Sequence, residues 1–575
     1  MTQPYSPKRS ALGAKASSLA LALSVALAAP LSVFAAPNGT NTVNDGQIIQ
    51  GGNYFNTKGS ETVFQNSAKT GLYLKGGDTV TAREVNGVGQ LTGNGGNVHI
   101  NAPGQVVRLD GNIDASGLIV NGVLGNGGHV KIDAGYLYQN GQIFLQGQHG
   151  GQANINVGAM TVGPNAGIFA NSTGGGNGGV VTINSKGAVD IAKGAIIDTS
   201  GKVIGTYDTN VINIQGGLVN LDGVLKANGG APGDSGGAVL VAANGKSQAM
   251  DLNAIQKTDF FKGDADAIAA ATHTANLSKT MDGHIAIGPT GKVLAEGAAG
   301  FIGYNPTNGG DGGFIRLVAN DGRVDNNGLV SVNGGDGGFN PDPAIGPVIL
   351  AKEGNNCVWQ QTSLGQNGGN GGHAGQVQIA FKENGFSNNG MITANGGKGG
   401  NGQEARADDA KATSHYSHGG DAGNGGNGGL VHLYGRPSDS SLANIQVNGG
   451  EGGKGGIAVP NKCHGACNGQ PGIPGQPGEI IVTPPPETIT PNTPLPPPYP
   501  KENTRIGDTL PGALGPLVNY NRSIFMARAP LPIIQKKPKP VIVPPPPPPP
   551  AKPKAVYHAP PKKPVKKRVP VRGYW

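Results

Sequence analysis

Charged and aromatic residues are scarce in this chain: of its 575 residues, 14% are charged and 5% are aromatic. So few large side chains cannot fill several conventional globular cores. The chain has only three cysteines, which excludes an extensive disulfide framework because three leaves one unpaired. After residue 35 no apolar run approaches the ~20 residues of a membrane-spanning helix, so we expect no span in the mature chain.

Glycine and proline are abundant instead. The 102 Gly and 44 Pro make up about a quarter of the chain, against roughly an eighth in average proteins. The glycines follow no strict three-residue period along the whole chain, which excludes collagen. This composition favours a repeat architecture built on small residues, with disordered flanks.

The net charge of +8 is concentrated at one end of the chain. Residues 536–575 contain no acidic residue and eleven basic ones: Lys536, Lys537, Lys539, Lys552, Lys554, Lys562, Lys563, Lys566, Lys567, Arg568 and Arg572. We expect a disordered, extended Pro/Lys-rich tail that binds an anionic envelope polymer or glycan in a salt-sensitive way. The alternative is a solubilising spacer without a partner. The rest of the chain is mildly acidic, so no specific nucleic-acid interface is predicted.

The first 35 residues have the pattern of a secretory signal peptide. Lys8, Arg9 and Lys15 precede an apolar run over 19–33, and small residues follow up to Ala36. We predict cleavage after Ala35, with a retained membrane anchor as the alternative. The mature protein is then exported, either secreted or held at the cell surface of a bacterial outer envelope.

Three cysteines fit an oxidising compartment poorly as a disulfide framework, because one is left over. Cys463 and Cys467 bracket a short loop, so we expect a disulfide between them or between one of them and Cys357. A zinc site would need a fourth ligand that this spacing does not supply.

A repeated phrase runs through the glycine-rich body of the chain. It consists of a Gly-Gly pair, three short apolar strands and a Gly-rich loop, and it is clearest at 95–117, 127–145 and 178–201. Alternation at period two sends Val, Ile and Leu to one face of each strand. Strands this short need stacked neighbours, and stacking in parallel builds one continuous aliphatic interior. The repeat predicts an all-β, right-handed parallel β-helix, and the alternative is a disordered Gly/Asn-rich linker.

The repeat also defines the expected domains. We expect a cap or first strands at 36–90, the β-helix over 91–456, a Pro/Gly-rich linker over 457–535 and the basic tail over 536–575. Three insertions interrupt the β-helix: an Ala-rich, mostly helical segment at 249–282 and long Gly-rich loops at 336–374 and 396–429. The collagen-like run at 469–478 is too short for a triple helix, so a turn-rich exit is predicted.

Residues that resemble catalytic or metal-binding groups are few. Five carboxylates fall on or near strands without a paired pattern, and structural roles are expected for them: Asp110, Asp114, Asp190, Asp198 and Asp222. His415, His418 and Asp421 lie in a Gly-rich segment that we interpret as a solvated loop. Ser235 lies in Gly-Asp-Ser-Gly-Gly but has no suitably placed His and Asp. The sequence therefore predicts no catalytic, cofactor or metal site.

The apolar rungs at 95–117, 127–145 and 178–201, behind a signal peptide, resemble the filamentous-haemagglutinin group of bacterial exoproteins. The resemblance implies a right-handed β-helical adhesin exported by a dedicated outer-membrane partner. That group's Asn-Pro-Asn-Leu and Asn-Pro-Asn-Gly-Ile secretion motifs are absent, and residues 305–308 read Asn-Pro-Thr-Asn.

We expect a non-enzymatic, adhesin-like surface or matrix protein that displays loops on a β-helix and is tethered by its basic tail. One alternative is a polysaccharide lyase or hydrolase on a pectate-lyase-like β-helix, which would need clustered carboxylates in a groove. A second alternative is a structural envelope protein whose tail crosses a wall layer.

Overall fold

The computed structural model describes residues 71–483, apart from gaps at 87–89, 204–207, 354–355, 383–384, 413 and 460–466, together with four short strands between residues 41 and 66. Strands account for 42% of the structure and helices for 6%, so the fold is all-β with large parallel sheets. The predicted signal peptide, most of the predicted linker and the basic tail lie outside the described residues.

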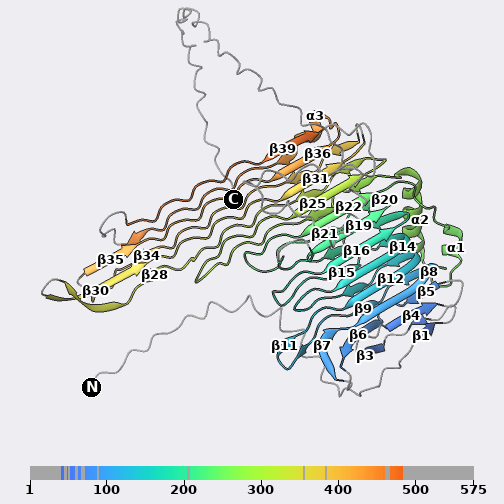
Figure 1. The fold of residues 1–575 in the computed structure, drawn as a ribbon, viewed down its shortest axis with the longest axis horizontal. Coiled ribbons are helices and arrows are strands. Elements are labelled where there is room, and N and C mark those ends of the chain that lie inside the picture. Colours follow the sequence, from blue (N-terminus) through green and yellow to red (C-terminus); the bar gives the residue numbers. More distant parts are fainter. Residues whose placement is uncertain are drawn as a thin grey trace, which may run out of the picture. The chain divides into compact units, whose positions relative to one another are not determined.

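Most strands belong to two large sheets (Figure 1). Sheet 1 has 19 described strands: β1 (Asn41–Val43), β2 (Ile48–Ile49), β4 (Thr62–Asn66), β5 (Gly71–Leu74), β8 (Asn97–Leu109), β12 (His129–Gln139), β14 (Gln152–Val162), β16 (Val180–Ser185), β17 (Ala188–Ile191), β19 (Val211–Gly216), β20 (Leu218–Leu221), β22 (Ala238–Ala243), β23 (Ile285–Ile287), β25 (Phe314–Ala319), β26 (Val324–Asn326), β31 (Gln376–Ala380), β32 (Phe386–Asn388), β36 (Leu430–Tyr434) and β39 (Glu479–Thr483).

Sheet 2 has 12 described strands: β3 (Gly52–Thr57), β6 (Thr79–Val85), β7 (Leu91–Gly95), β9 (Asn112–Asp114), β13 (Gln142–Phe144), β15 (Gly167–Phe169), β18 (Ile196–Asp198), β21 (Val224–Lys226), β24 (Lys292–Leu294), β27 (Leu329–Ser331), β33 (Met391–Thr393) and β37 (Ile445–Gln446). Two three-stranded sheets are formed by β28 (Ala344–Ile345), β34 (Ala405–Arg406) and β38 (Ala458–Val459), and by β29 (Val348–Glu353), β30 (Asn356–Leu364) and β35 (Ser414–His418). A hairpin joins β10 (Ile119–Val120) and β11 (Val123–Leu124).

Each copy of the repeat, which we call a turn, adds strands to both large sheets in a fixed order. In one turn the chain passes through β16 and β17 in sheet 1 and then β18 in sheet 2, and the next turn repeats this order with β19, β20 and β21. Each strand pairs in parallel with its counterpart one turn later. The last of these pairings joins β39 to β36, so the stack continues to Thr483, beyond the boundary at 456 that the sequence predicts.

The pairing register places identical positions of successive turns in columns. Sheet 1 contributes a column of aliphatic side chains, and sheet 2 contributes another: Ile155, Ile183, Ile214, Val241, Leu317, Ile379 and Leu433; and Ile168, Ile197, Leu225, Val293, Val330 and Ile392. All of them are at most 2% exposed and belong to a single buried cluster. The alternation that the sequence shows thus fills one interior between the two sheets.

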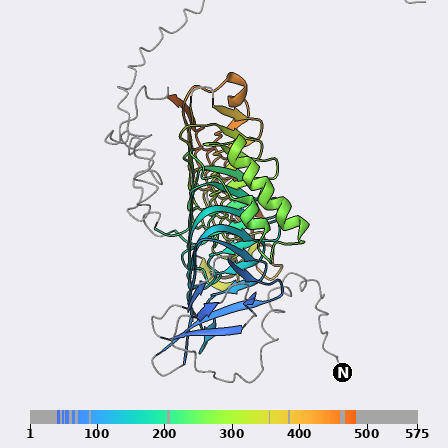
Figure 2. The same ribbon diagram turned by 90° about the vertical axis from the view of Figure 1, so that its right-hand side faces the viewer.

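Two helices, α1 (Leu252–Gln256) and α2 (Ala265–Thr280), lie in the Ala-rich segment 249–282 and cover the outer face of sheet 1 (Figure 2). A further helix, α3 (Asp439–Leu442), contains only four residues. Phe261 is fully buried between the helices and the sheet, with its ring 6.2 Å from that of Tyr136 and 5.9 Å from that of Tyr138. The Asp264 side chain caps α2 by accepting a hydrogen bond from the Ala267 N–H.

The later Gly-rich segments form an ordered projection that we call the glycine arm, where the sequence predicts surface loops. Outbound segments leave sheet 2, and return segments lead back to sheet 1 (Figure 1). The outbound segments span 296–303, 333–340, 395–404 and 448–457, and the return segments span 305–313, 365–375, 419–429 and 467–478. The sheets that contain β28 and β30 lie at the far end of the arm.

Backbone hydrogen bonds in the arm repeat every three residues. The Gly371 N–H donates to the Asn424 carbonyl of the next return segment, and the Gly372 N–H donates to the Gly335 carbonyl of its own outbound segment, both at 2.8 Å. The third N–H of the triplet, that of Asn370, donates to a side chain, Asn308 Oδ1, at 2.8 Å. A three-residue period matches the three residues per turn of a polyproline II helix, which has no internal hydrogen bonds and leaves its backbone groups for neighbouring segments. The outbound and return segments therefore form two layers held together by their backbones.

Backbone atoms fill most of the interior of the arm, which explains its glycines. A Cβ atom added to Gly371 would lie 2.0 Å from the Gly397 carbonyl oxygen, and one added to Gly372 would lie 2.0 Å from the Gly310 oxygen. Neither glycine has a left-handed φ, so close approach of neighbouring backbones, not conformational freedom, requires glycine here.

Candidate functional site

Four of the five carboxylates near strands have side-chain partners: Asp110, Asp114, Asp190 and Asp198. Arg108 holds Asp110 at 2.6 Å and also pairs with Asp264 at the start of α2. Its guanidinium lies over the rings of Tyr73 and Phe261, so this buried cation fastens the helices to sheet 1. The role of Arg108 was not predictable from the sequence, because its partners in the helical segment, the Phe260 carbonyl and Asp264, lie more than 150 residues further along the chain.

Two further carboxylates are held in the same way. Burial favours the neutral form of Asp114, but the hydrogen bond and charge of Arg83 leave the pKa of this carboxyl below its ordinary value. Asp190 accepts hydrogen bonds from Thr274 at 3.0 Å and from Asn220 at 2.9 Å, and it lies 2.9 Å from His273 Nδ1. The hydrogen bond to Asp190 raises the pKa of His273. The contacts of Asp190 with His273 and Thr274 clamp α2 onto sheet 1.

The remaining sequence candidates lie apart from one another. Asp198 pairs with Lys226 of the next turn at 3.3 Å, and Asp222 directly follows β20. His415 Nε2 lies 3.0 Å from the Asp409 carbonyl, and His418 Nδ1 lies 2.9 Å from the Gly419 carbonyl. Within the described residues, no three His, Cys, Asp or Glu side chains gather as a metal site.

Ser235 lies in an extended Gly-rich segment that leads into β22. The N–H of its neighbour Gly236 donates to the Asp311 carbonyl at 2.8 Å. The segment therefore belongs to the backbone lattice at the base of the arm.

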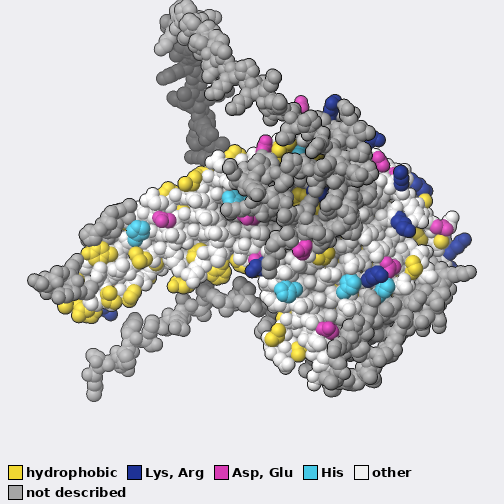
Figure 3. Space-filling view, in the orientation of Figure 1, with side chains coloured by type: hydrophobic (Ala, Val, Ile, Leu, Met, Phe, Trp, Pro, Cys, Tyr) yellow, Lys and Arg dark blue, Asp and Glu magenta, His cyan; other side chains and the backbone are white. Residues whose placement is uncertain are grey.

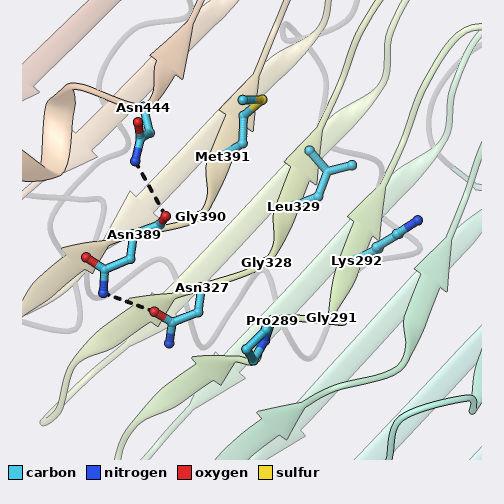
Figure 4. A pocket seen from close by; sticks show the side chains of 10 residues that line it. All are labelled: Pro289, Gly291, Lys292, Asn327, Gly328, Leu329, Asn389, Gly390, Met391 and Asn444. Atoms are coloured by element: carbon cyan, nitrogen blue, oxygen red, sulfur yellow. Dashed lines mark hydrogen bonds between the residues drawn. The ribbon is translucent and has the colours of Figure 1, made fainter. Parts of the chain in front are cut away.

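A shallow pocket of about 360 Å³ lies along the outer edge of sheet 2 (Figure 4). It is lined by corner residues of successive turns, where Asn389 Nδ2 donates to Asn327 Oδ1 at 3.0 Å. Lys292 is the only ionisable side chain in its lining, and no carboxylate reaches it. A glycosidase needs two carboxyl groups flanking its substrate, so this pocket lacks the groups for that chemistry.

The return layer of the arm presents ladders of polar side chains on its outer face, which we call the amide face. Each side-chain acceptor takes the backbone N–H of the equivalent residue one turn later, at 2.8–2.9 Å. Three columns result: Asn308, Asn370, Asn424 and Ile473; Asp311, His373, Asn427 and Gln476; and Asn367, Asp421 and Gln470. The sequence signal is a polar residue after each Gly-Gly pair, a pattern that is also typical of loops.

The outbound layer has similar ladders with a different charge. Asn333, Asn395 and Asn448 form one column through Oδ1 contacts of 2.8 Å. Lys398 pairs with Glu451 at 3.2 Å, and its N–H donates to Asp336 Oδ1. This face therefore carries ion pairs and lysines that the amide face lacks.

Prolines replace glycines in the last return segment, within the collagen-like run for which the sequence predicts turns. Pro474 is equivalent to Gly425 of the previous turn, whose N–H donates to the Ile473 carbonyl. Proline has no N–H to donate, and Pro471, Pro474 and Pro477 are all exposed. No later segment lies beyond them in the described part of the chain, so the prolines close the hydrogen-bonding edge of the layer.

The far end of the arm exposes a group of apolar side chains that we call the apolar tip (Figure 3). Leu350 and Trp359 face each other across the antiparallel β29–β30 hairpin. The tip comprises side chains that are 50–69% exposed: Ile345, Ile349, Leu350, Trp359, Leu364 and Ile457. Contiguous exposed apolar side chains of this kind mark interaction sites in soluble proteins.

The cysteines and the basic tail complete the predicted sites. Cys467 is disulfide-bonded and Cys357 is free and exposed. Cys463 and all eleven basic residues of the tail lie outside the described residues.

No helix in the described chain combines the length and apolarity needed to span a membrane. Comparisons with protein-family models, with curated proteins and with solved structures give no match for this chain.

Proposed function

We propose that this protein is an exported, non-enzymatic surface-adhesion protein built on a right-handed parallel β-helix. In-register parallel pairing between successive turns and a single aliphatic interior between sheets 1 and 2 support the β-helix. Right-handed crossovers are the general rule for parallel strands in one sheet. On this scaffold the glycine arm holds the apolar tip away from the body.

The observation that carries the adhesive role is the exposure of Leu350 and Trp359 at the end of the arm. Aromatic side chains, tryptophan above all, are typical of the centres of binding interfaces, and Leu350 extends the apolar surface beside Trp359. A rigid backbone lattice positions them without the entropic cost of ordering a loop. The arm therefore serves as a stalk, and the tip serves as its contact point.

The alternative of a polysaccharide lyase or hydrolase has less support. Asp110, Asp114 and Asp190 are each engaged by a cation or by several hydrogen-bond donors. The pocket beside Lys292 contains no carboxylate. Neither place offers the acid and base that hydrolysis requires.

Export through the predicted signal peptide and tethering through the basic tail complete the proposal. The signal peptide directs the chain out of the cell, by an outer-membrane partner if the resemblance to filamentous haemagglutinin extends to export. The eleven cations of residues 536–575 bind an anionic envelope polymer. The alternative, a tail that crosses a wall layer as part of a structural envelope protein, predicts retention that does not fall with salt.

The test compares surface binding of matched variants of the processed chain. At a salt concentration that releases the basic tail from the envelope, Leu350→Ser with Trp359→Ser should reduce retention on purified cell envelopes at least tenfold. Ile119→Ser with Val123→Ser changes two apolar side chains on the β10–β11 hairpin that are more exposed than Leu350 and Trp359, and should leave retention within twofold. Equal retention of both variants, or release of reducing ends or unsaturated sugars from a glycan panel, would contradict the proposal.

A further inference from the structure

The amide face has the properties of a polysaccharide-binding surface. Asn308, Asn370 and Asn424 are exposed, and the Oδ1 atoms of all three accept a backbone N–H of the next turn. These contacts fix the orientation of each amide and leave its Nδ2 group pointing to solvent as an unused donor. Since the side chains are already ordered, a ligand does not pay to immobilise them.

The spacing of these donors is regular in two directions. Polyproline II strands rise ~3.1 Å per residue, so equivalent side chains recur roughly every 9 Å along a strand. Neighbouring strands in hydrogen-bonded layers lie ~4.8 Å apart, so each column offers a side chain at about that interval. This interval is close to the length of one pyranose unit in an extended β-1,4-linked chain, which presents hydroxyl groups at a matching repeat.

The charge of the face selects among polymers. The three columns contain two carboxylates, Asp311 and Asp421, and neither lysine nor arginine. An anionic polymer or a nucleic acid would find no cation there, whereas hydroxyl groups both accept from amide N–H groups and donate to carboxylates. The flatness of the layer suits an extended ribbon and does not suit a compact ligand that needs a concave pocket.

We propose that the amide face binds a neutral, extended polysaccharide through the Nδ2 groups of Asn308, Asn370 and Asn424. The inference rests on the proposed adhesive function and names the class of polymer that the arm recognises. The apolar tip and the amide face lie on different parts of the arm, so each can be tested while the other is intact.

The chain itself provides the substitution for the test. Asp311 and Asp421 occupy ladder positions and accept the next backbone N–H at 2.8 Å, so aspartate preserves the ladder. Changing Asn308, Asn370 and Asn424 to Asp therefore removes the outward donors and keeps the acceptors that brace the layer. Changing Asn333, Asn395 and Asn448 to Asp adds the same charge to a ladder on the outbound face. In that ladder the Nδ2 groups of Asn333 and Asn395 already donate to Glu296 and Gln446.

The assay measures binding of the processed chain to microcrystalline cellulose and to chitin. We expect the amide-face triple variant to lose at least tenfold in affinity for a neutral polymer, and the outbound triple variant to bind within twofold of the unmodified chain. Unchanged hydrogen exchange in the arm verifies that both variants retain the lattice.

Several outcomes would overturn the inference. Equal losses in both triple variants would indicate a charge effect, and a change in oligomeric state of the amide-face variant alone would assign this face to self-association. Failure of the unmodified chain to bind either neutral polymer, while it still binds envelopes through Leu350 and Trp359, would reject the amide face and leave the proposed adhesive function standing.

Discussion

Replacing Gly372 by alanine tests whether the glycine arm is a backbone lattice. The new Cβ would lie 2.0 Å from the Gly310 oxygen, whereas ordinary contacts begin at 3.4 Å, so the strands must separate by about 1.4 Å. That oxygen also accepts the Gly335 N–H at 2.8 Å, and Gly372 donates to the Gly335 carbonyl at the same distance. Separation therefore breaks two hydrogen bonds in an interior that water does not reach.

The cost follows from the groups left without partners. Each lost bond removes about 1 kcal/mol, and each buried group left unsatisfied adds about 1–3 kcal/mol. We expect a local loss of about 4 kcal/mol in the arm, which corresponds to roughly a thousandfold faster amide exchange because 1.4 kcal/mol is a factor of ten. The paired strands β12 and β14 should keep their protection, since they lie in the body.

Hydrogen exchange followed by mass spectrometry resolves the two regions. Gly76→Ala is the matched control, because its Cβ would meet no atom closer than 3.7 Å and its φ is not left-handed. Exchange in 333–340 and 365–375 that is the same in both variants would refute the view that close backbone packing requires glycine in the arm.

Two further predictions concern the end of the stack. Burial lowers the pKa of His432 to about 4, below its ordinary ~6.5. The unfolded chain therefore binds the proton more readily than the folded chain. The free energy of unfolding falls as the pH drops from about 6.5 to 4, by at most about 3 kcal/mol. Thermal unfolding at pH 7 and pH 4 should show a smaller loss of stability at pH 4 for His432→Phe than for the unmodified chain. An equal loss in both proteins would contradict the role of His432. Replacing Pro471, Pro474 and Pro477 by glycine restores three outward N–H groups at the last edge. Light scattering should therefore detect concentration-dependent association of this variant. The control Gln470→Gly opens no such donor, so its light scattering should match that of the unmodified chain.

The sequence predicted the parts of this fold that depend on local pattern. Period-two alternation at residues such as Val181 and Ile183 identified strands whose side chains are buried in columns. The Ala-rich composition of 249–282 predicted the helices, which α1 and α2 provide. These features follow from side-chain volume and backbone propensity, which a single sequence displays.

The glycine arm was not predictable in the same way. Glycines such as Gly371 and Gly372 are also typical of flexible linkers, and their role depends on carbonyls that lie 26 and 62 residues away in sequence, at Gly397 and Gly310. The binding surfaces were missed for the same reason. The amides of the ladder and the pair of Leu350 with Trp359 become sites only once distant segments are in register.

The three-residue period restricts how the arm can change in length. Adding one residue to a single segment would rotate every later side chain into the space between the layers, where only backbone fits. Adding one triplet to the outbound and return segments of every turn keeps all partners and extends the reach by roughly 9 Å. The length of the arm can therefore change only in discrete steps. Each step requires simultaneous insertions at several places in the gene.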